Sequence, residues 1–395
     1  MPDGALTGRS RYRWAILAAG FTAQAAFAAV GLGLPVIAPA LRDEFGLSLA
    51  EVGIVLGAGW VGTILTLLPW GLAVDRVGER WTLGAGMALC AVTLAGAAFV
   101  DSLVPLVLLL GASGAAGSSV QSGSGRAIMN WFDRDERGLA LGIRQTAVPV
   151  GGIVGALALP ATVDSGGIRA AFLLLAALAA LGALLGTLLL RERVREHIVE
   201  AVPWTLRDRR LWLVCWGSGL YLVAQVAVLG FLVLYLHDER GFSVSRAAAV
   251  LAAINVLGAA FRIGGGRWSD VLGSRLRPLR WVGLALVGAM AASAAATAAP
   301  VAVAVAAFLV AGGLSMAWNG LSFTAAAELA GESRSGAAIG FQQTVLSVIG
   351  AAVPPAFAVL VEATSWRTAF AAAAVVPLAG WWALGFVTER PRSPG

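Results

Sequence analysis

Two stretches of the sequence carry the same residues at the same spacing: GLAVDRVGER at 71–80 and GRWSDVLGSR at 266–275. Each has a glycine, an aspartate four residues later, a second glycine three residues after that and an arginine two residues further on. The offset is 195 residues in a chain of 395. Related offsets of 195 and 198 map EFGLS at 44–48 onto ERGFS at 239–243, and GIRQT at 142–146 onto GFQQT at 340–344. The sequence therefore predicts two copies of one structural unit.

The composition places both copies in a membrane. Hydrophobic residues make up 58% of the chain and charged residues 13%, against roughly a quarter charged in soluble domains. A helix of about 20 apolar residues crosses the ~30 Å core of a bilayer. Twelve apolar windows of sufficient length lie at 14–40, 49–73, 81–100, 103–131, 138–162, 168–190, 211–236, 245–267, 280–299, 301–327, 336–361 and 367–388. We therefore expect an all-α membrane protein with twelve transmembrane helices in two pseudo-symmetric six-helix bundles.

The chain divides at its most charged stretch, 191–210. We expect an N-terminal bundle at 1–190, this stretch as a cytoplasmic linker, and a C-terminal bundle at 211–395. The 28 lysine-plus-arginine positions are all arginine, and with the N-terminus inside, 20 of them fall in inner loops and tails and five in outer loops. Because positive charge accumulates on the cytoplasmic side, both termini are predicted to be cytoplasmic, in a multi-pass protein of the inner (plasma) membrane.

The loop at 71–80 after span two, with its echo after span eight, resembles the major facilitator superfamily. The resemblance covers the whole chain, and it implies a transporter that works by alternating access. The spacing from Arg262 through Gly266 to Asp270 resembles the monocarboxylate and oxalate carriers, in which an arginine at that register binds the substrate carboxylate. The loop at 131–142 resembles the organic-anion branch that includes hexuronate carriers. The chain departs from the monocarboxylate carriers at Gly258, where they have an acid, and it has no lysine in span one.

The duplicated loop supplies a candidate conformational switch. Its glycines permit close helix approach and a tight turn, and its aspartates can bond a helix N-terminus or an arginine across the two halves. The alternative interpretation is a plain solvated turn. The residues of the candidate switch are Gly71, Asp75, Arg76, Gly78, Arg80, Gly266, Asp270, Gly273 and Arg275. We assign Arg126, close to Trp131, to structural pairing or to the membrane interface.

Polar side chains deep in the spans are candidates for substrate binding, because each costs free energy in a bilayer. A rise of ~1.5 Å per residue puts them roughly 10 to 15 Å from the inner face. The predicted substrate-binding residues are Arg262, Arg144, Gln121, Gln145, Asn319, Gln343, Gln24 and Gln342. The competing interpretations are an interhelical hydrogen bond for the glutamines, and a side chain that extends to the lipid headgroups for the arginines.

Two deep arginines from opposite halves, with no acidic residue at the same depth, favour an anionic substrate. A guanidinium bonds a carboxylate through two parallel N–H donors. We therefore expect a secondary active or facilitative transporter of a small organic anion, most plausibly a carboxylate. The first alternative is a proton-coupled exporter of drugs or metabolites from the same superfamily. From other classes, a transporter-like membrane sensor and a polytopic membrane enzyme are the alternatives.

The sequence also predicts which partners the chain has. They are a small anionic molecule and the lipid bilayer, with a coupling proton or a counter-anion as a further candidate. Nucleic acid is not among them, and the chain is expected to be a monomer. His197 and His237 lie on opposite faces, and the two cysteines lie within apolar runs. No catalytic residue, cofactor or metal site is therefore predicted.

Overall fold

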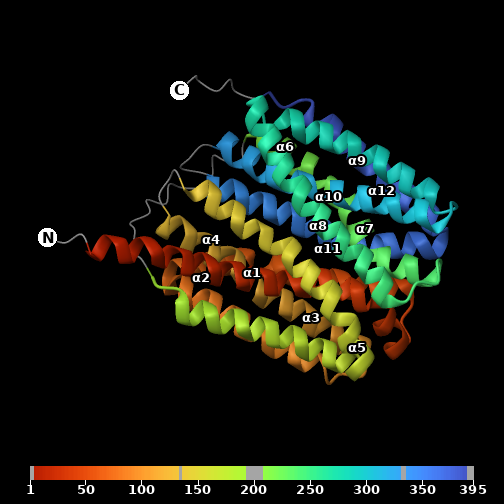
Figure 1. Ribbon diagram of the computed structural model, residues 1–395, viewed down its shortest axis with the longest axis horizontal. Coiled ribbons are helices and arrows are strands. Elements are labelled where there is room, and N and C mark those ends of the chain that lie inside the picture. Colours follow the sequence, from red (N-terminus) through yellow and green to blue (C-terminus); the bar gives the residue numbers. More distant parts are fainter. Residues whose placement is uncertain (1–3, 133–135, 193–207, 331–334, 389–395) are drawn as a thin grey trace. The chain divides into compact units, whose positions relative to one another are not determined.

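A computed structural model describes residues 4–132, 136–192, 208–330 and 335–388, and all of their regular secondary structure is α-helical. Figure 1 shows the long helices of each unit running side by side. Their bounds are α1 (Gly4–Phe45), α2 (Leu49–Ala97), α3 (Leu103–Gly117), α4 (Ser119–Trp131), α5 (Arg137–Leu189), α6 (Arg209–Gly219), α7 (Tyr221–Asp238), α8 (Val244–Leu272), α9 (Leu276–Ala296), α10 (Val301–Ala330), α11 (Ser335–Ala363) and α12 (Trp366–Leu384).

The chain forms two compact units. The first comprises 1–46 and 58–197, and the second comprises 47–57 and 198–395. The linker expected at 191–210 lies for the most part outside the described residues. The division into bundles at 1–190 and 211–395 therefore stays a prediction.

The described helices correspond to twelve membrane crossings, although ten continuous segments are long and apolar enough to span a bilayer. Two of these segments have twice the required length: α2 has 49 residues and α5 has 53, or roughly 75 to 80 Å at 1.5 Å per residue. Each is broken by one glycine with non-helical dihedral angles, Gly78 in α2 and Gly167 in α5. Spans two and three thus form α2, and spans five and six form α5.

Span four is interrupted between α3 and α4, which the sequence did not predict. An interrupted helix leaves backbone groups without their helical partners, and in a membrane these must be satisfied by neighbouring protein. The carbonyl oxygen of Ala115 accepts hydrogen bonds from Thr66 Oγ1 at 2.8 Å and from Trp70 Nε1 at 2.6 Å, both on α2. The Ser118 hydroxyl, at the interruption itself, donates to the same carbonyl at 2.9 Å. Side chains of span two therefore support the break in span four.

The loop glycines have positive φ at matched positions of the two copies. Gly78 and Gly273, the second glycines of the duplicated loop, have φ of 83° and 60°. Gly46 and Gly241, in the second pair of matched stretches, have φ of 61° and 65°. Residues with a Cβ rarely adopt such angles. The sign of φ is therefore shared by both pairs, although ψ differs between Gly78 (171°) and Gly273 (20°).

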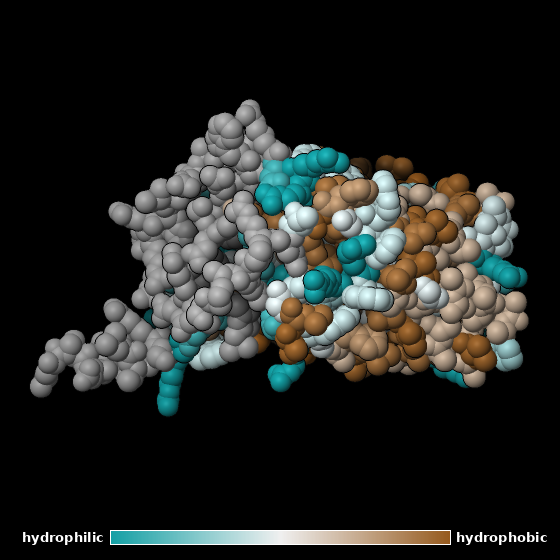
Figure 2. Space-filling view, turned by 90° about the horizontal axis from the view of Figure 1, so that it is seen from above, coloured by the Kyte–Doolittle hydropathy of each residue, from teal (hydrophilic) through white to brown (hydrophobic). Residues whose placement is uncertain are grey.

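Close contact between α1 and α5 positions the polar residues of the first unit. A Cβ atom built on Gly151 of α5 would lie 2.2 Å from the carbonyl oxygen of Ala25 on α1. Glycine is therefore required there for the two backbones to approach. Apolar side chains such as Leu65 and Leu68 are exposed, and Figure 2 shows many hydrophobic residues (brown) on the coloured part of the face that it draws. Such a surface suits a lipid environment.

Candidate functional site

Arg144 lies at the centre of the polar residues of the first unit. Its Nε donates to Ser124 Oγ of α4 at 2.7 Å. Its Nη2 donates to Gln24 Oε1 of α1 and to Gln121 Oε1 of α4, both at 3.0 Å. Three of the predicted residues, from three different spans, therefore meet in one group. The interhelical hydrogen bonds expected for the glutamines are present, and their donor is the arginine.

None of the described residues that bond the Arg144 guanidinium carries a counter-charge. The residue is 6% exposed, and its partners among the described residues are three neutral oxygen atoms. The guanidinium has five N–H donors; Nε and Nη2 are used, whereas Nη1 donates to no described group. A buried cation with neutral partners and a spare amino group can accept an anion.

The second unit has its own polar group, around the carbonyl oxygen of Met316 on α10. Arg262 Nε donates to this oxygen at 3.4 Å, and Asn319 Nδ2 donates to it at 3.3 Å. Asn319 Nδ2 also donates to Gln225 Oε1 of α7 at 3.2 Å. Arg262 and Asn319 therefore lie together, as predicted. Gln225, which the sequence analysis did not select, joins them.

Gln342 lies in a separate, fully buried cluster of the second unit. Its Nε2 donates to Ser218 Oγ at 3.3 Å, and Ser218 Oγ lies 2.6 Å from Ser322 Oγ. The offset of 198 maps Arg144 onto Gln342 and Ser124 onto Ser322. It also maps Gly20, whose Cβ position is 3.0 Å from Ser124 Cβ, onto Ser218. The first unit thus combines the larger side chain, Arg144, with Gly20. The second unit combines the smaller Gln342 with Ser218.

Gln145 and Gln343 are the remaining predicted glutamines, one in each unit. Gln145 and Gln343 are both half-buried and follow Arg144 and Gln342 directly in the sequence. Their assignment to substrate binding stays a prediction.

The switch aspartate of the first unit is paired within that unit. Asp75 Oδ1 forms an ion pair with Arg126 Nη1 of α4, which confirms structural pairing for Arg126. One turn further along each helix, Asn130 Nδ2 donates to Glu79 Oε1 at 2.5 Å. No neighbouring atom lies within 4 Å of a Cβ built on Gly71 or Gly266, so these two glycines do not mediate close helix approach within their own units. The expected contact of Asp75 across the two halves stays a prediction.

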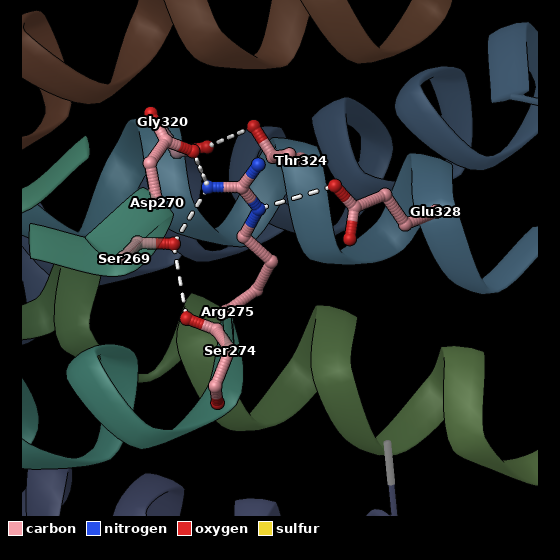
Figure 3. A network of polar contacts seen from close by, with 7 residues as sticks. All are labelled: Ser269, Asp270, Ser274, Arg275, Gly320, Thr324 and Glu328. Atoms are coloured by element: carbon pink, nitrogen blue, oxygen red, sulfur yellow. Dashed lines mark hydrogen bonds and ion pairs between the residues drawn. The ribbon is translucent and has the colours of Figure 1, made fainter. Parts of the chain in front are cut away.

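Arg275 organises the corresponding loop of the second unit (Figure 3). Its Nη1 donates to Asp270 Oδ1 at 2.5 Å and to Ser269 Oγ at 2.7 Å, and its Nε donates to Glu328 Oε1 at 3.1 Å. Burial alone would lower the pKa of Arg275, but the hydrogen bonds and charges of Asp270 and Glu328 outweigh burial and raise it. The cation therefore ties the end of α8 to α10. Arg76 is exposed beside Asp75, and Arg80 stacks on Trp81.

Comparison with known sequences identifies the family. A sequence profile of the Major Facilitator Superfamily matches residues 15–354. An uncharacterised MFS-type transporter of Mycobacterium tuberculosis (strain ATCC 25618 / H37Rv) is 32% identical over 388 residues, which cover 97% of this chain and 86% of that protein. A protein of Cupriavidus necator named as a probable sulfoacetate transporter is 25% identical over 370 residues, or 84% of each chain.

Solved structures show the same fold. The crystal structure of a bacterial homologue of the human lysosomal transporter Spinster, in an inward-facing and occupied conformation, has a TM-score of 0.76. It covers 95% of this chain and 94% of its own, with 18% sequence identity. Together with the profile match and the paired six-span pattern, this agreement confirms the fold expected from the duplicated loop. The chain belongs to the Major Facilitator Superfamily and is a multi-pass membrane transporter, not an enzyme.

Proposed function

We propose that this transporter carries a small organic anion, a carboxylate, and that Arg144 and Arg262 bind it. The observation that carries the proposal is the neutral environment of Arg144. A buried guanidinium without a carboxylate partner is costly to desolvate, and an arriving anion offsets that cost. In this proposal the anion bonds to Nη1, while Ser124, Gln24 and Gln121 hold the rest of the guanidinium in place.

Arg262 supplies the second contact in this proposal. Its position next to Asn319 offers a charged donor and an amide to the same ligand, and the Met316 carbonyl fixes both side chains. The similarity to a protein named as a sulfoacetate transporter supports an anion with a carboxylate and a second polar group. Gln145 and Gln343 would bond the remaining oxygens of the substrate, whereas the fully buried Gln342 is assigned to the packing of its own unit.

The proposed coupling follows from the partners of Arg144. Among the described residues these are the neutral oxygens of Ser124, Gln24 and Gln121, none of which could carry a proton across the membrane as a carboxylate would. We therefore expect exchange of anions, facilitated diffusion, or a proton carried by the substrate itself. The proton-coupled exporter is the alternative function.

Uptake into proteoliposomes tests the proposal. The probes are radiolabelled sulfoacetate, lactate and glucuronate, with a lipophilic cation such as ethidium as the test of the exporter alternative. We expect uptake of at least one of the three anions and none of ethidium. In the Arg144→Gln variant, the affinity for that anion should fall roughly 10- to 100-fold, because a charged hydrogen bond contributes about 1.5–3 kcal/mol.

Arg169→Gln is the matched control, because it removes one arginine at an exposed position where the guanidinium stacks on Phe99. Anion uptake should be unchanged in this variant. Arg144→Lys keeps the charge but loses the fixed fork of donors, so it should show intermediate affinity. Transport of ethidium without any of the anions, or normal anion affinity in Arg144→Gln, would refute the proposal.

A further inference from the structure

Arg280, in the second turn of α9, is a cation held by an aromatic ring instead of an acceptor. Its Cζ lies 5.0 Å from the centre of the Trp381 ring on α12. A Cβ atom built on Gly385 would be 3.2 Å from its Nη2, so the guanidinium lies over the end of α12. Its Nε is buried and has no hydrogen-bond partner among the described residues. The Nε is enclosed by protein, but no described residue bonds the two terminal amino groups of Arg280, and these can donate to an oxyanion.

Two exposed indoles flank this guanidinium. Trp281 follows Arg280 on α9 and is 61% exposed, and Trp382 follows Trp381 on α12 and is 63% exposed. The helices of the second unit therefore leave both rings uncovered. Indole side chains prefer the boundary between lipid headgroups and acyl chains, where the ring is apolar and its N–H is solvated. Their position places the guanidinium at headgroup level.

An apolar track leads away from the indoles on both helices. On α9, Leu284 stands one turn beyond Trp281 and is exposed. On α12, Leu378 and Val375 precede Trp382 by one and two turns, and both are exposed. A free phosphate ion has no apolar groups that could pack against this track, whereas the acyl chains of a lipid could lie along it. The shape and chemistry of the surface match a molecule with an anionic head and apolar tails.

The first unit also has an arginine on a tryptophan near the start of a span, although the offset of 195 maps this arginine, Arg80, onto Arg275 and not onto Arg280. Arg80 and Trp81 stand shortly after the turn glycine Gly78, at the start of span three, as Arg280 and Trp281 stand at the start of span nine. The Arg80 Cζ lies 5.1 Å from the centre of the Trp81 ring, and Trp81 is exposed. The Nε of Arg80 is also buried without a hydrogen-bond partner among the described residues. Unlike Arg280, Arg80 stacks on its own sequence neighbour and not on a ring of a second helix, so the case for a site rests on Arg280.

We propose that Arg280, together with Trp281, Trp381 and Trp382, forms a binding site for the phosphate headgroup of an anionic phospholipid. The phosphate oxygens accept hydrogen bonds from the guanidinium, and Trp381 keeps the planar guanidinium oriented toward them. The indoles of Trp281 and Trp382 lie against the glycerol region, and the acyl chains follow Leu284 and Leu378. This site is separate from the transported substrate and does not depend on its identity.

Native mass spectrometry of the full-length protein tests the site. The protein is equilibrated in micelles that contain equal amounts of phosphatidylglycerol and phosphatidylcholine, and the retained molecules of each lipid are counted. We expect selective retention of phosphatidylglycerol by the unmodified protein. Arg280→Gln should lower the occupancy of one phosphatidylglycerol by roughly tenfold, as expected for the loss of a charge-assisted hydrogen bond, and should leave phosphatidylcholine unchanged.

Arg277→Gln is the matched control, because Arg277 is exposed on the first turn of the same helix and stacks on no ring. It removes the same charge and should retain phosphatidylglycerol. If Arg280→Gln does not fold, Arg280→Lys tests the site instead. This variant keeps the charge but loses the paired guanidinium donors, so it should retain less phosphatidylglycerol than the unmodified protein. Equal retention in the Arg280 variants, or an equal loss in Arg277→Gln, would overturn the proposal. Displacement of the lipid by millimolar inorganic phosphate would also overturn it, in favour of a soluble ligand.

Discussion

Arg144 Nε donates to Ser124 Oγ at 2.7 Å, and the Ser124 hydroxyl donates to the carbonyl oxygen of Val120 at 2.6 Å. The hydroxyl proton is thereby occupied within α4, so a lone pair of the oxygen faces the guanidinium. Ser124 thus orients the guanidinium so that its Nε bonds to the protein. In this orientation Nη1 donates to no described residue and is open to a ligand.

Ser124→Ala should weaken anion binding without removing any charge. The Nε donor of Arg144 would lose its acceptor in a buried position, which costs about 1–3 kcal/mol. We expect a lower melting temperature and an apparent affinity for the transported anion that is lower by about tenfold. Ser113→Ala is the control, because the Ser113 hydroxyl is buried and donates only to Leu110 of its own helix. An affinity as high in Ser124→Ala as in Ser113→Ala would show that Ser124 does not position Arg144.

The exchange of glycine and serine between the halves predicts how an arginine can be introduced into the second unit. Gln342→Arg alone should be destabilising by roughly 1–3 kcal/mol, because the buried cluster has no room for a longer side chain. Removing the Ser218 side chain creates the space that Gly20 provides next to Ser124, the hydroxyl partner of Arg144. The double variant Ser218→Gly/Gln342→Arg should therefore melt at a higher temperature than Gln342→Arg. If the second substitution lowers the melting temperature further, as Ser218→Gly does alone, the two positions are not equivalent.

The two turn glycines should differ in their tolerance of alanine. Gly273 has φ 60° and ψ 20°, a left-handed conformation that costs a residue with a Cβ roughly 1–2 kcal/mol. Gly78 has φ 83° and ψ 171°, a region open almost only to glycine, and a Cβ there would also lie 2.3 Å from Glu192 Oε1. Thermal unfolding should show that Gly78→Ala is the more destabilising change.

Gly71→Ala serves as the reference for these two variants. Gly71 lies within the helix, and no neighbouring atom lies within 4 Å of its Cβ position. Alanine there should be neutral or stabilising by about 0.5–1 kcal/mol. An order of stability in which Gly71→Ala is the worst of the three would contradict the role assigned to the turn glycines.

We expect Asp75 and Arg126 to act together, through their ion pair, in holding the cytoplasmic side closed. Their side chains are 56% and 29% exposed, so the ion pair itself contributes at most about 1 kcal/mol to stability. The expected effect is on conformation: Asp75→Asn should raise the alkylation rate of a single cysteine placed at Ser122 of α4. Arg126→Gln should raise it equally, and the double variant no further. Additive effects of the two changes would show that each residue has a different partner in the closed state.

Much of the architecture follows from patterns that the membrane imposes on the sequence. Apolar windows and the spacing of Gly78 and Gly273 predict the spans and their duplication, because a bilayer requires helices of fixed length and glycine is needed where φ is positive. Depth along the helix correctly groups Gln24, Gln121 and Arg144, since residues at equal depth on adjacent spans can meet. The interruption at Ser118 has no such signal, because the neighbouring Ala115 carbonyl is bonded by Thr66 and Trp70, which are distant in the sequence.

The short hydroxyl residues of the site are harder to identify. Ser124, Ser218 and Ser322 resemble the many serines that bond to their own helix, and only their neighbours distinguish them. One signal was available: the offset of 198 that relates Gln121 to Asn319 also relates Ser124 to Ser322. Gln225 has no polar counterpart at that offset. Whether Arg144 and Arg262 share one ligand depends on the arrangement of the halves and stays a prediction.

The single-residue turn at Gly78 couples the movements of spans two and three in the first unit. Helical backbone lies directly on both sides of this glycine, without the slack that a longer connection would provide. When span two tilts, span three is therefore expected to tilt with it, because the two helices are joined directly at Gly78. An epitope tag inserted at Gly78 should uncouple the movements of the two spans. Proteolysis at this turn should be slow, because there is no extended chain for a protease to bind.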